Sequence, residues 1–203
     1  MITHSWNGEP RPAALTSVSD LADVYLALLA DLDLADVLIV GSSLGGWIAS
    51  AMAVRDTANT VSRIVVIDGA GIAVEGQEFV DFFSLTPREI AEHSWHDADR
   101  FFVDPSTFST AQRAAQAANM QTMGVLAGNP YMHDPALLEK LGGVTVPALV
   151  LWGESDRVFT PDYGRAYAAA FGDGRFELVH EAGHLPQLEQ PVATFAAVDA
   201  FTA

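Results

Sequence analysis

The chain has 203 residues, of which 50% are hydrophobic and 18% are charged, so we expect one folded domain with a sizeable core and exclude an intrinsically disordered chain. Asp and Glu number 26 against 10 Lys and Arg, for a net charge of −16; because such a surface repels phosphate groups, we expect neither nucleic acid nor a membrane as a partner. No cysteine is present, which excludes disulfides, thiolate metal sites and a cysteine nucleophile.

The amino-terminal residues have neither the basic region nor the apolar stretch of a secretory signal. The most apolar stretch, residues 21–40, is interrupted by four aspartates and does not read as a membrane span (Asp23, Asp31, Asp33 and Asp36). We therefore expect a soluble, cytoplasmic protein.

A helix is predicted over residues 17–32. Ser17 and Asp20 have the spacing of a capping box at its start. Apolar residues then recur at i, i+3, i+4, i+7, i+8 and i+11, which places them on one helical face: Leu21, Val24, Tyr25, Leu28, Leu29 and Leu32. Residues 37–40 follow as a short, wholly apolar run, typical of a strand buried on both faces of a parallel sheet.

A turn of small residues, Gly41–Gly46, joins that strand to a helix predicted from Leu44 to about Arg55. Further strands are predicted at residues 64–67, 148–152 and 175–179, and further helices begin at Pro161 and Pro191, since proline suits the first helical turn. Because strands and helices alternate, we expect an α/β fold in which a parallel sheet is flanked by helices.

The segment between the second and third strands is too long for a single crossover. Three stretches in it have helical composition: residues 86–93, 108–123 and 135–141. We therefore expect a core made of residues 1–71 and 144–203, with residues 72–143 as a helical cap insertion over one end of the sheet. The insertion holds six of the eleven phenylalanines, which we expect to form mainly its own core.

Gly41-Ser42-Ser43-Leu44-Gly45 matches the pattern G-x-S-x-G between a buried strand and a helix. This pattern predicts a sharp turn that projects the Ser43 hydroxyl above the sheet, with Gly41 and Gly45 where side chains would clash. The helix that begins at Leu44 points its first amides at the same place, so the Leu44 N–H is a candidate oxyanion donor. Ser43 is the candidate nucleophile. A phosphate-binding turn is the alternative, which the lack of a neighbouring basic residue disfavours.

A serine nucleophile needs a base and an orienting acid. His184 follows the fourth strand, and Asp156 follows the third, so the chain order is Ser43, Asp156, His184. All three stand at carboxyl ends of strands, where parallel sheets place their sites. Asp68, at the end of the second strand, is the alternative acid.

Residues 13–203 resemble an α/β-hydrolase of the capped type, which includes esterases and carbon–carbon hydrolases. The segments that carry the resemblance are Val40–Gly46, Leu149–Arg157 and Glu181–Pro191. The resemblance implies that Ser43 is the nucleophile, that His184 is general base and then acid, and that Asp156 orients His184, without a cofactor.

Two positions depart from particular branches of that family. Ser43 stands where haloalkane dehalogenases and epoxide hydrolases have an aspartate nucleophile. Leu185 stands where ring-cleavage-product hydrolases often have a tryptophan after the catalytic histidine.

The resemblance also implies several strands before the helix at residues 17–32, one of which pairs with the strand at residues 37–40. The loop after that partner strand supplies the second oxyanion amide in the family. Only 16 residues precede the helix here, too few for this region. We therefore expect an N-terminally shortened core with an exposed, apolar strand edge, and weak activity, since one oxyanion donor is worth about 10²–10³ in turnover. Three ways to cover the edge remain open: residues 1–12, a second copy in a homodimer, or a longer natural start.

Two histidine patterns could in principle hold a metal ion, but their sequence surroundings disfavour this. His180-Glu181-Ala182-Gly183-His184 matches the zinc protease motif H-E-x-x-H, which needs both histidines on one helical face. Gly183 and the nearby Pro186 disfavour a helix, so we expect no metal. His93 and His96 flank Trp95 and are expected on a solvated or hydrogen-bonded face of the insertion.

The sequence as a whole predicts a serine hydrolase that cleaves an ester-like bond of a small apolar substrate through an acyl-enzyme. Two alternatives stay open. One is a carbon–carbon bond hydrolase of dienone acids, and the other is a catalytically crippled relative whose exposed strand serves assembly.

Overall fold

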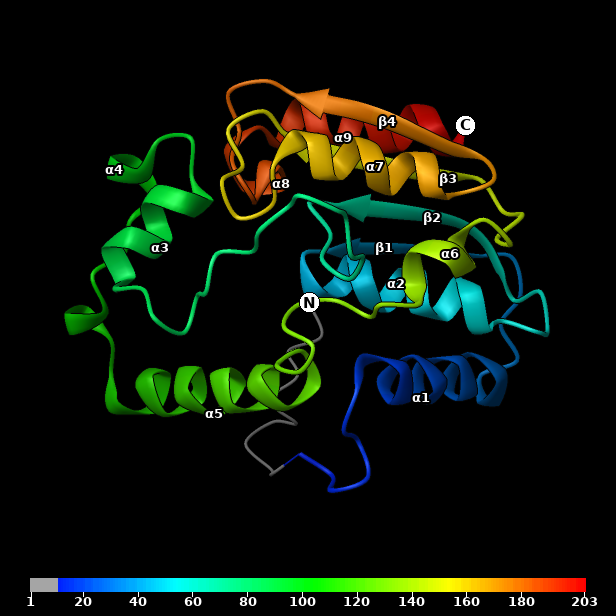
Figure 1. The fold of residues 1–203 in the computed structure, drawn as a ribbon, viewed down its shortest axis with the longest axis horizontal. Coiled ribbons are helices and arrows are strands. Elements are labelled where there is room, and N and C mark those ends of the chain that lie inside the picture. Colours follow the sequence, from blue (N-terminus) through cyan, green and yellow to red (C-terminus); the bar gives the residue numbers. More distant parts are fainter. Residues whose placement is uncertain (1–10) are drawn as a thin grey trace.

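A four-stranded sheet forms the centre of the structure, a computed structural model that describes residues 11–203 (Figure 1). The strands lie in the order β1-β2-β3-β4 and are all parallel, so their carboxyl ends share one edge: β1 (Val37–Ser42), β2 (Val61–Ile67), β3 (Ala148–Gly153) and β4 (Gly174–Val179). This confirms the expected fold class, a parallel sheet with flanking helices.

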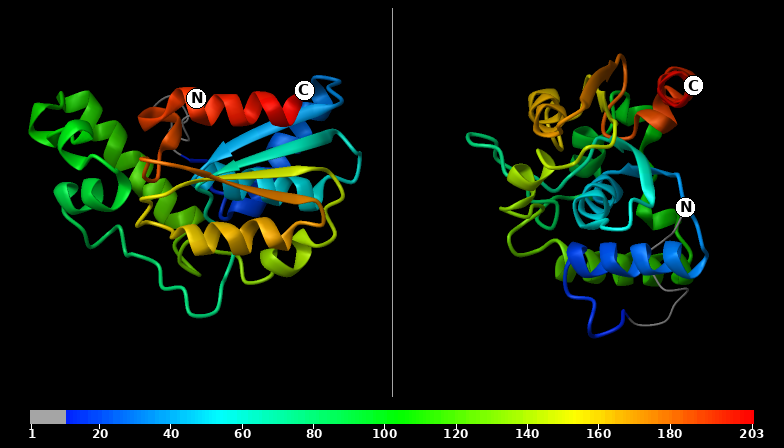
Figure 2. Two further views of the ribbon diagram at one scale, coloured as in Figure 1. Left: turned by 90° about the horizontal axis from the view of Figure 1, so that it is seen from above. Right: turned by 90° about the vertical axis from the view of Figure 1, so that its right-hand side faces the viewer.

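Helices cover the two faces of the sheet unequally (Figure 2). Among the described elements, α2 (Leu44–Arg55) and α7 (Pro161–Ala170) pack on one face, with α1 (Val18–Asp31) and α6 (Leu137–Leu141) against them, and α9 (Pro191–Thr202) packs on the other face. Alternate strand residues accordingly belong to two cores. Val66, Val150 and Trp152 join the larger core, whereas Val65 and Leu151 join the smaller one with Val198 of α9.

Local signals explain where these helices begin. Ser17 caps α1 in a reciprocal capping box with Asp20, as predicted. Thr160 caps α7, and proline occupies the first turn of both α7 and α9.

The first strand departs from the prediction of a strand buried on both faces and, within the described residues, is the exposed, apolar edge that was also predicted. Residues 37–40 have the composition of a strand buried on both faces, yet β1 is the edge of the described sheet, and Leu38 and Val40 are 37% and 48% exposed. The reason is positional, because α9 packs on β3 and β4 and does not reach over β1. The apolar face of α1 is likewise only partly buried: Leu21 is buried, but Val24, Leu28 and Leu32 are exposed.

The segment between β2 and β3 holds the helices α3 (Pro87–Ser94), α4 (Ala98–Phe101) and α5 (Thr110–Leu126), before α6 returns to pack on α2 and α7. Figures 1 and 2 place α3, α4 and α5 on the side toward which the strands point. Three short helical turns escaped the sequence analysis: α4, Pro105–Thr107 and α8 (Pro186–Glu189).

The aromatic residues of this segment do not form one separate core. Phe79 packs against Phe159 and Tyr163 of the main core, and Trp95 stacks on Phe101 at 4.9 Å. Ile72, Leu126 and Leu137 are buried in the main core as well. Both ends of the segment thus pack on the sheet layer, and the division into core and cap at residues 72 and 143 stays a prediction.

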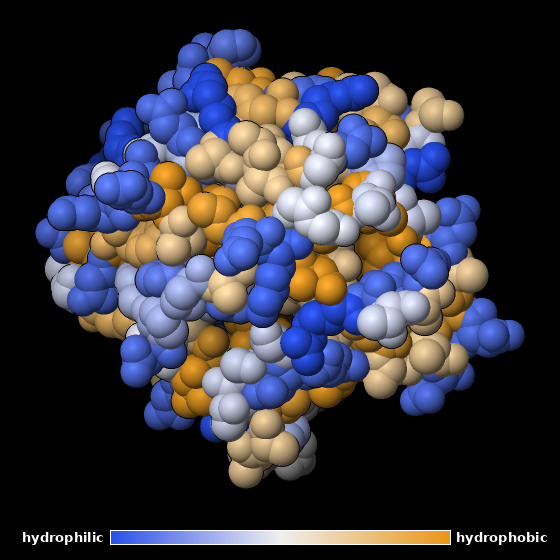
Figure 3. Space-filling view, turned by 45° about the vertical axis from the view of Figure 1, so that its right-hand side comes forward, coloured by the Kyte–Doolittle hydropathy of each residue, from blue (hydrophilic) through white to orange (hydrophobic). Residues whose placement is uncertain are grey.

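Apolar side chains also reach the surface. Figure 3 shows one face of the molecule, on which hydrophobic residues lie in patches between hydrophilic ones. Within residues 11–203, no helix is both long and apolar enough to cross a bilayer.

Candidate active site

Ser43 stands at the junction of β1 and α2 in a strained backbone conformation, with φ 55° and ψ −120°. Neighbouring elements hold this conformation. The Ser43 N–H donates to the Ile67 carbonyl at 2.9 Å, and the Ser43 carbonyl accepts from the amides of Gly46 and Ala70. Turn and sheet are therefore locked together, which fixes the direction of the Ser43 hydroxyl.

The glycines of this turn have different roles. A Cβ on Gly41 would lie 2.1 Å from the Gly45 carbonyl oxygen, so Gly41 is required, as predicted. Gly45 is different, because a Cβ there would meet nothing within 4 Å, and the prediction of a clash at Gly45 is wrong. The second close approach is made by Gly46 instead, where a Cβ would lie 2.8 Å from the Gly69 Cα.

His184 lies in the loop between β4 and α8, and its ring connects the two other candidate residues. Its Nε2 is 2.9 Å from Ser43 Oγ, and its Nδ1 is 2.9 Å from Asp156 Oδ2. With Nδ1 protonated, the neutral ring donates to Asp156 and accepts the proton of the Ser43 hydroxyl. Its backbone N–H donates to the Ser94 carbonyl at 2.6 Å, which fixes the loop.

Asp156 is buried in the loop after β3, and both of its oxygens are hydrogen-bonded. Oδ2 contacts His184, while Oδ1 accepts from the backbone amides of Val158 at 2.7 Å and Phe159 at 3.2 Å. These amides hold Oδ1 and so fix the orientation of the carboxyl group, with Oδ2 facing the ring. The carboxylate is therefore positioned to orient His184 and to stabilise an imidazolium.

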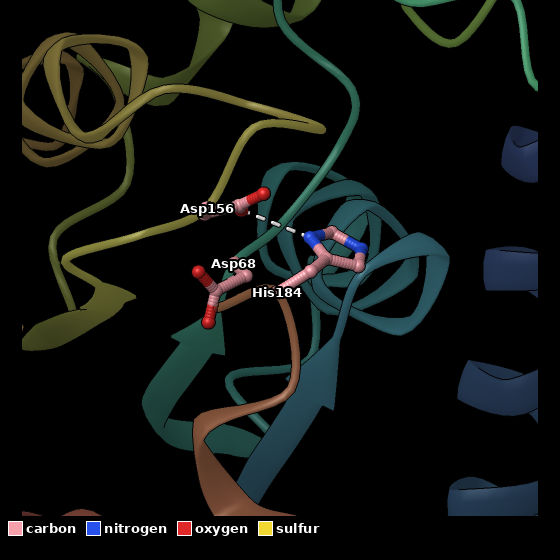
Figure 4. Close-up of side chains that lie close together, drawn as sticks. All are labelled: Asp68, Asp156 and His184. Carbon is pink, nitrogen blue, oxygen red and sulfur yellow. Dashed lines mark hydrogen bonds and ion pairs between the residues drawn. The ribbon is translucent and has the colours of Figure 1, made fainter. Parts of the chain in front are cut away.

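Asp68 is close to this pair but does not contact the histidine (Figure 4). One of its oxygens accepts from the Gly153 amide at 2.9 Å, and the other has no hydrogen-bond partner among the described residues. Burial raises the pKa of Asp68 well above its usual range, and the negative charge of Asp156 raises it further. The alternative acid is therefore a fully buried carboxyl whose neutral form is favoured, while Asp156 makes the hydrogen bond to His184.

The Leu44 N–H, the predicted oxyanion donor, is at the first position of α2 beside Ser43. It has no acceptor among the described residues. It is thus free to donate to an oxygen that develops charge next to Ser43 Oγ, with the positive end of the α2 dipole behind it.

The other histidines do not join this site. His180 and His184 lie in a loop rather than on one helical face, and exposed His180 is 3.2 Å from Glu154. His96 Nδ1 contacts Ser155 Oγ at 2.7 Å, and His93 Nδ1 contacts the Glu89 carbonyl, so the expected hydrogen-bonded face is confirmed for these two. In the part of the chain that is described, the one group with metal-binding spacing is Asp68, Asp156 and His184.

Two residues near the site escaped the sequence analysis. Glu189 of α8 accepts from the amides of His96, Asp97 and Gly183, and so ties the histidine loop to the α3–α4 turn. Gln187 donates to Ser42 Oγ at 3.1 Å. Both lie in the segment Glu181–Pro191 that carries the resemblance, but no role was assigned to them, because most of their partners are distant in sequence and only the tertiary structure brings them together.

A hollow of about 760 Å³ adjoins Ser43 and Leu44, within the size range of small-molecule sites. The described residues that line it come from α1, β1, α2, the end of β2, the loop that holds His184, α8 and α9. None of them belongs to residues 72–143. A second hollow, of about 700 Å³, lies near Arg55 and Lys140 and contains none of the candidate catalytic residues.

Comparisons with known proteins identify relatives of this chain. The family model described as "Alpha/beta hydrolase family" matches residues 3–198. A 2-hydroxy-6-oxononadienedioate/2-hydroxy-6-oxononatrienedioate hydrolase of Cupriavidus pinatubonensis is 26% identical over 84% of this chain and 63% of its own length. The 3-oxoadipate enol-lactonase 1 of Acinetobacter baylyi is 26% identical over 87% of this chain and 67% of its own.

Among solved structures, a meta-cleavage product hydrolase of Pseudomonas fluorescens superposes with a TM-score of 0.75 at 20% identity, over 95% of this chain and 74% of that one. The chain spans 63% of the length of the Cupriavidus pinatubonensis hydrolase, which is less than two thirds. Since one family model covers nearly the whole sequence, the chain belongs to the alpha/beta hydrolase family.

Proposed function

We propose that this chain is a cytoplasmic serine hydrolase that cleaves an ester-like bond of a small apolar substrate through an acyl-enzyme. The observation that carries the proposal is the continuous relay from Ser43 Oγ through the His184 ring to Asp156, with 2.9 Å at each step. This relay supplies nucleophile, base and acid from the chain itself, so the proposal needs no cofactor.

The first half-reaction forms the acyl-enzyme. Ser43 Oγ attacks the substrate carbonyl carbon while its proton moves to His184 Nε2. The carbonyl oxygen becomes an oxyanion that accepts a hydrogen bond from the Leu44 N–H. His184, now an imidazolium beside Asp156, gives the proton to the leaving alcohol oxygen, and the carbon–oxygen bond breaks.

The second half-reaction clears the acyl group. Water enters as the alcohol leaves, and His184 Nε2 takes one of its protons as the oxygen attacks the acyl carbon. The proton then passes to Ser43 Oγ, and the acid product departs. Asp156 stays charged throughout and holds the ring in the tautomer that both steps need.

A carbon–carbon bond hydrolase of dienone acids is the second candidate. It is favoured by the similarity to the hydrolase of Cupriavidus pinatubonensis, which is named for a dienedioate or trienedioate substrate. The two candidates separate by turnover, because the first requires hydrolysis of uncharged esters and the second requires cleavage of dienone acids with poor turnover of simple esters.

An assembly role without catalysis is the third candidate, favoured by the exposed apolar edge at Leu38 and Val40. It predicts an unreactive Ser43 and a homodimer through β1.

Labelling with a fluorophosphonate tests the proposal. Intact-protein mass is measured for the wild type and for Ser43→Ala after incubation with the probe. One adduct on the wild type and none on the variant is the expected result, because only an activated serine reacts readily. A folded wild type without an adduct would overturn the proposal and favour the assembly role.

A further inference from the structure

We propose that Glu189 is a positioning residue for the reaction: it closes a brace in which residues 92–97 hold together the loops of the catalytic acid and the catalytic base. The brace consists of the end of α3 and the turn that follows it, in the long segment between β2 and β3. The inference rests on the proposed function, because it concerns the reactivity of Ser43. It deepens that function by giving this segment a part in placing His184 against the nucleophile.

The end of α3 is hydrogen-bonded to both catalytic loops. The last carbonyl groups of an α-helix have no partner within the helix. In α3 they accept from outside: the Arg157 guanidinium donates to the Glu92 carbonyl at 2.7 Å, and the Arg157 N–H donates to the His93 carbonyl at 3.1 Å. The Ser94 carbonyl accepts from the His184 N–H at 2.6 Å. Since Arg157 directly follows the catalytic acid in sequence, one helix end holds both loops.

Glu189 closes the brace from the side of α8. Its carboxylate accepts from the amides of His96 at 3.0 Å and Asp97 at 3.1 Å, and also from the Gly183 amide at 2.6 Å. One carboxylate therefore joins the turn after α3 to the loop of the base. Hydrogen bonds to a charged acceptor are the stronger kind, so the loss of this link should loosen the brace. The His96 ring adds a contact to Ser155 Oγ, in the loop of the acid, at 2.7 Å.

The backbone of the histidine loop lies so close to the brace that a side chain at position 183 would collide with it. A Cβ on Gly183 would lie 2.3 Å from the Ser94 carbonyl oxygen and 2.8 Å from the Trp95 Cα. Both neighbours are backbone atoms, which cannot turn aside as the end of a flexible side chain can. The contact is therefore a fit between two backbones, and it sets the position of the next residue, His184.

Contacts between α3 and α4 hold the brace in shape. Trp95 stacks on Phe101 of α4, with the ring centroids 4.9 Å apart. Arg88 of α3 donates to Glu92 on the same helix at 2.8 Å and to Asp99 of α4 at 2.7 Å. Among the described helices and strands, α4 is the one on which α3 packs most extensively. The two helices thus form one unit that presents the brace to the catalytic loops.

Attachment of the segment to the fold is the competing explanation, but the place of attachment favours positioning. Within the described chain, the hydrogen bonds that leave residues 86–103 all go to the loop of Asp156, the loop of His184 or Glu189. The relay in these loops has 2.9 Å at each step, and a displacement of about 1 Å can cost on the order of 10²-fold in rate. The brace thus acts on the distances on which the rate depends.

Substitution of Glu189 tests the inference, with hydrolysis of p-nitrophenyl acetate as the readout. Glu189→Ala should lower kcat by about tenfold or more and keep KM within about threefold, because Glu189 holds the base rather than the substrate. Glu189→Gln should fall between the wild type and Glu189→Ala, since its single amide oxygen keeps part of the hydrogen bonding. A loss confined to KM, or a kcat of Glu189→Ala within about threefold of the wild type, would overturn the inference.

Glu154→Ala is the matched control. The Glu154 carboxylate also accepts from a backbone amide in these loops, that of Glu181 at 3.2 Å, but among the described residues it makes no hydrogen bond to residues 92–97. Its kcat should stay within about threefold of the wild type. Urea unfolding of both variants establishes that each is folded under the assay conditions. Equal losses of kcat in Glu189→Ala and Glu154→Ala would mean a general loosening of the loops and would contradict a specific brace.

Gly183→Ala separates the loop from the brace by a different route, because the new Cβ forces the two backbones apart. It should lower kcat as Glu189→Ala does. The double variant should lose much less than the product of the two single losses, since both substitutions break the same contact. A loss equal to that product would show two independent effects and would count against a single brace.

Hydrogen exchange followed by NMR separates this inference from the proposed catalysis. The amides of His96, Asp97 and Gly183 donate to Glu189, so they should exchange about tenfold faster or more in Glu189→Ala and at the wild-type rate in Glu154→Ala. If Ser43 takes no fluorophosphonate but these amides respond, the proposed function fails while the brace holds. If Ser43 is labelled and these amides do not respond, or Glu189→Ala is labelled as fast as the wild type, the proposed function stands and the positioning role of Glu189 is wrong.

Discussion

At the scale of single residues, the surroundings of two buried carboxyls give them different roles. Asp156 accepts two backbone N–H bonds through one oxygen and contacts His184 through the other. Asp68 has one backbone donor and no partner for its second oxygen. The sequence offered both as candidate acids, because both follow a strand, and only their hydrogen-bond partners distinguish them.

Substitution of each acid by its amide tests this division of roles. Asp156→Asn should lower kcat for ester hydrolysis on the order of 10³–10⁴-fold, because the amide no longer enforces the Nδ1–H tautomer of His184. Asp68→Asn should keep kcat within about tenfold, since a neutral side chain replaces a neutral one. Steady-state rates of both variants decide the matter, and a larger loss from Asp68→Asn would make Asp68 the orienting acid.

The raised pKa of Asp68 predicts how stability depends on pH. Above about pH 4 the unfolded chain has released a proton that folded Asp68 still holds. The contribution of Asp68 to stability is therefore complete below about pH 4 and is lost as the pH rises through its folded-state pKa. Asp68→Asn lacks this loss, so the difference in unfolding free energy between variant and wild type should shift toward the variant, by at most about 1.4 kcal/mol per pH unit. Urea unfolding of both proteins across the pH range measures it, and a pH-independent difference would refute the neutral Asp68.

At the scale of elements, the sequence predicted the regular structure well where the signal was local. The capping box at Ser17 and Asp20 and the proline at the start of α7 mark helix ends that depend on neighbouring residues alone. The turn at Ser43 was predicted for the same reason. The short helices α4 and α8 were missed because four residues carry too little periodicity to be recognised.

What escaped prediction at this scale was long-range. Residues 37–40 have the composition of a buried strand, and the exposed edge was predicted from the family resemblance rather than from composition. Glu189 contacts Gly183 in the His184 loop and also the amides of His96 and Asp97, more than 90 positions away, and this link between the two segments was not predicted. The hollow beside Ser43 is lined by residues of β1, α1 and α9 rather than by residues of the insertion. Only tertiary packing brings these elements together, so the sequence did not predict this lining.

The two glycines of the serine turn provide a matched test of its geometry. Gly41→Ala should destabilise the fold by at least about 2 kcal/mol, because its Cβ would meet the Gly45 carbonyl at 2.1 Å. Gly45→Ala should leave stability unchanged or raise it by up to about 1 kcal/mol, because the position is helical and has free space. Chemical denaturation of the two variants compares them directly. Equal destabilisation would mean that the turn differs from the structure described.

At the scale of the whole molecule, the net charge is strongly negative, whereas the described residues that line the hollow beside Ser43 are uncharged. The net charge of −16 is distributed over the surface, so self-repulsion opposes the compact state and salt should relieve it.

Salt dependence of the melting temperature checks the first of these points. Raising NaCl from about 0.05 to 0.5 M shortens the screening length from roughly 14 to 4 Å, so Tm should rise by several degrees. Differential scanning calorimetry at constant pH measures this change. A Tm that falls with salt would show that attractive ion pairs, such as Arg55 with Asp23, outweigh the repulsion.

If His184 activates Ser43 as a nucleophile, as we propose, the acyl-enzyme can be captured during ester hydrolysis. The protein is mixed with a p-nitrophenyl ester and quenched in acid, and its peptides are mapped by mass spectrometry. We expect an acyl group on Ser43 in the wild type, none on Ser43→Ala, and much slower acylation of His184→Ala. Ester hydrolysis that continues in Ser43→Ala, or an acyl group on another residue, would contradict it.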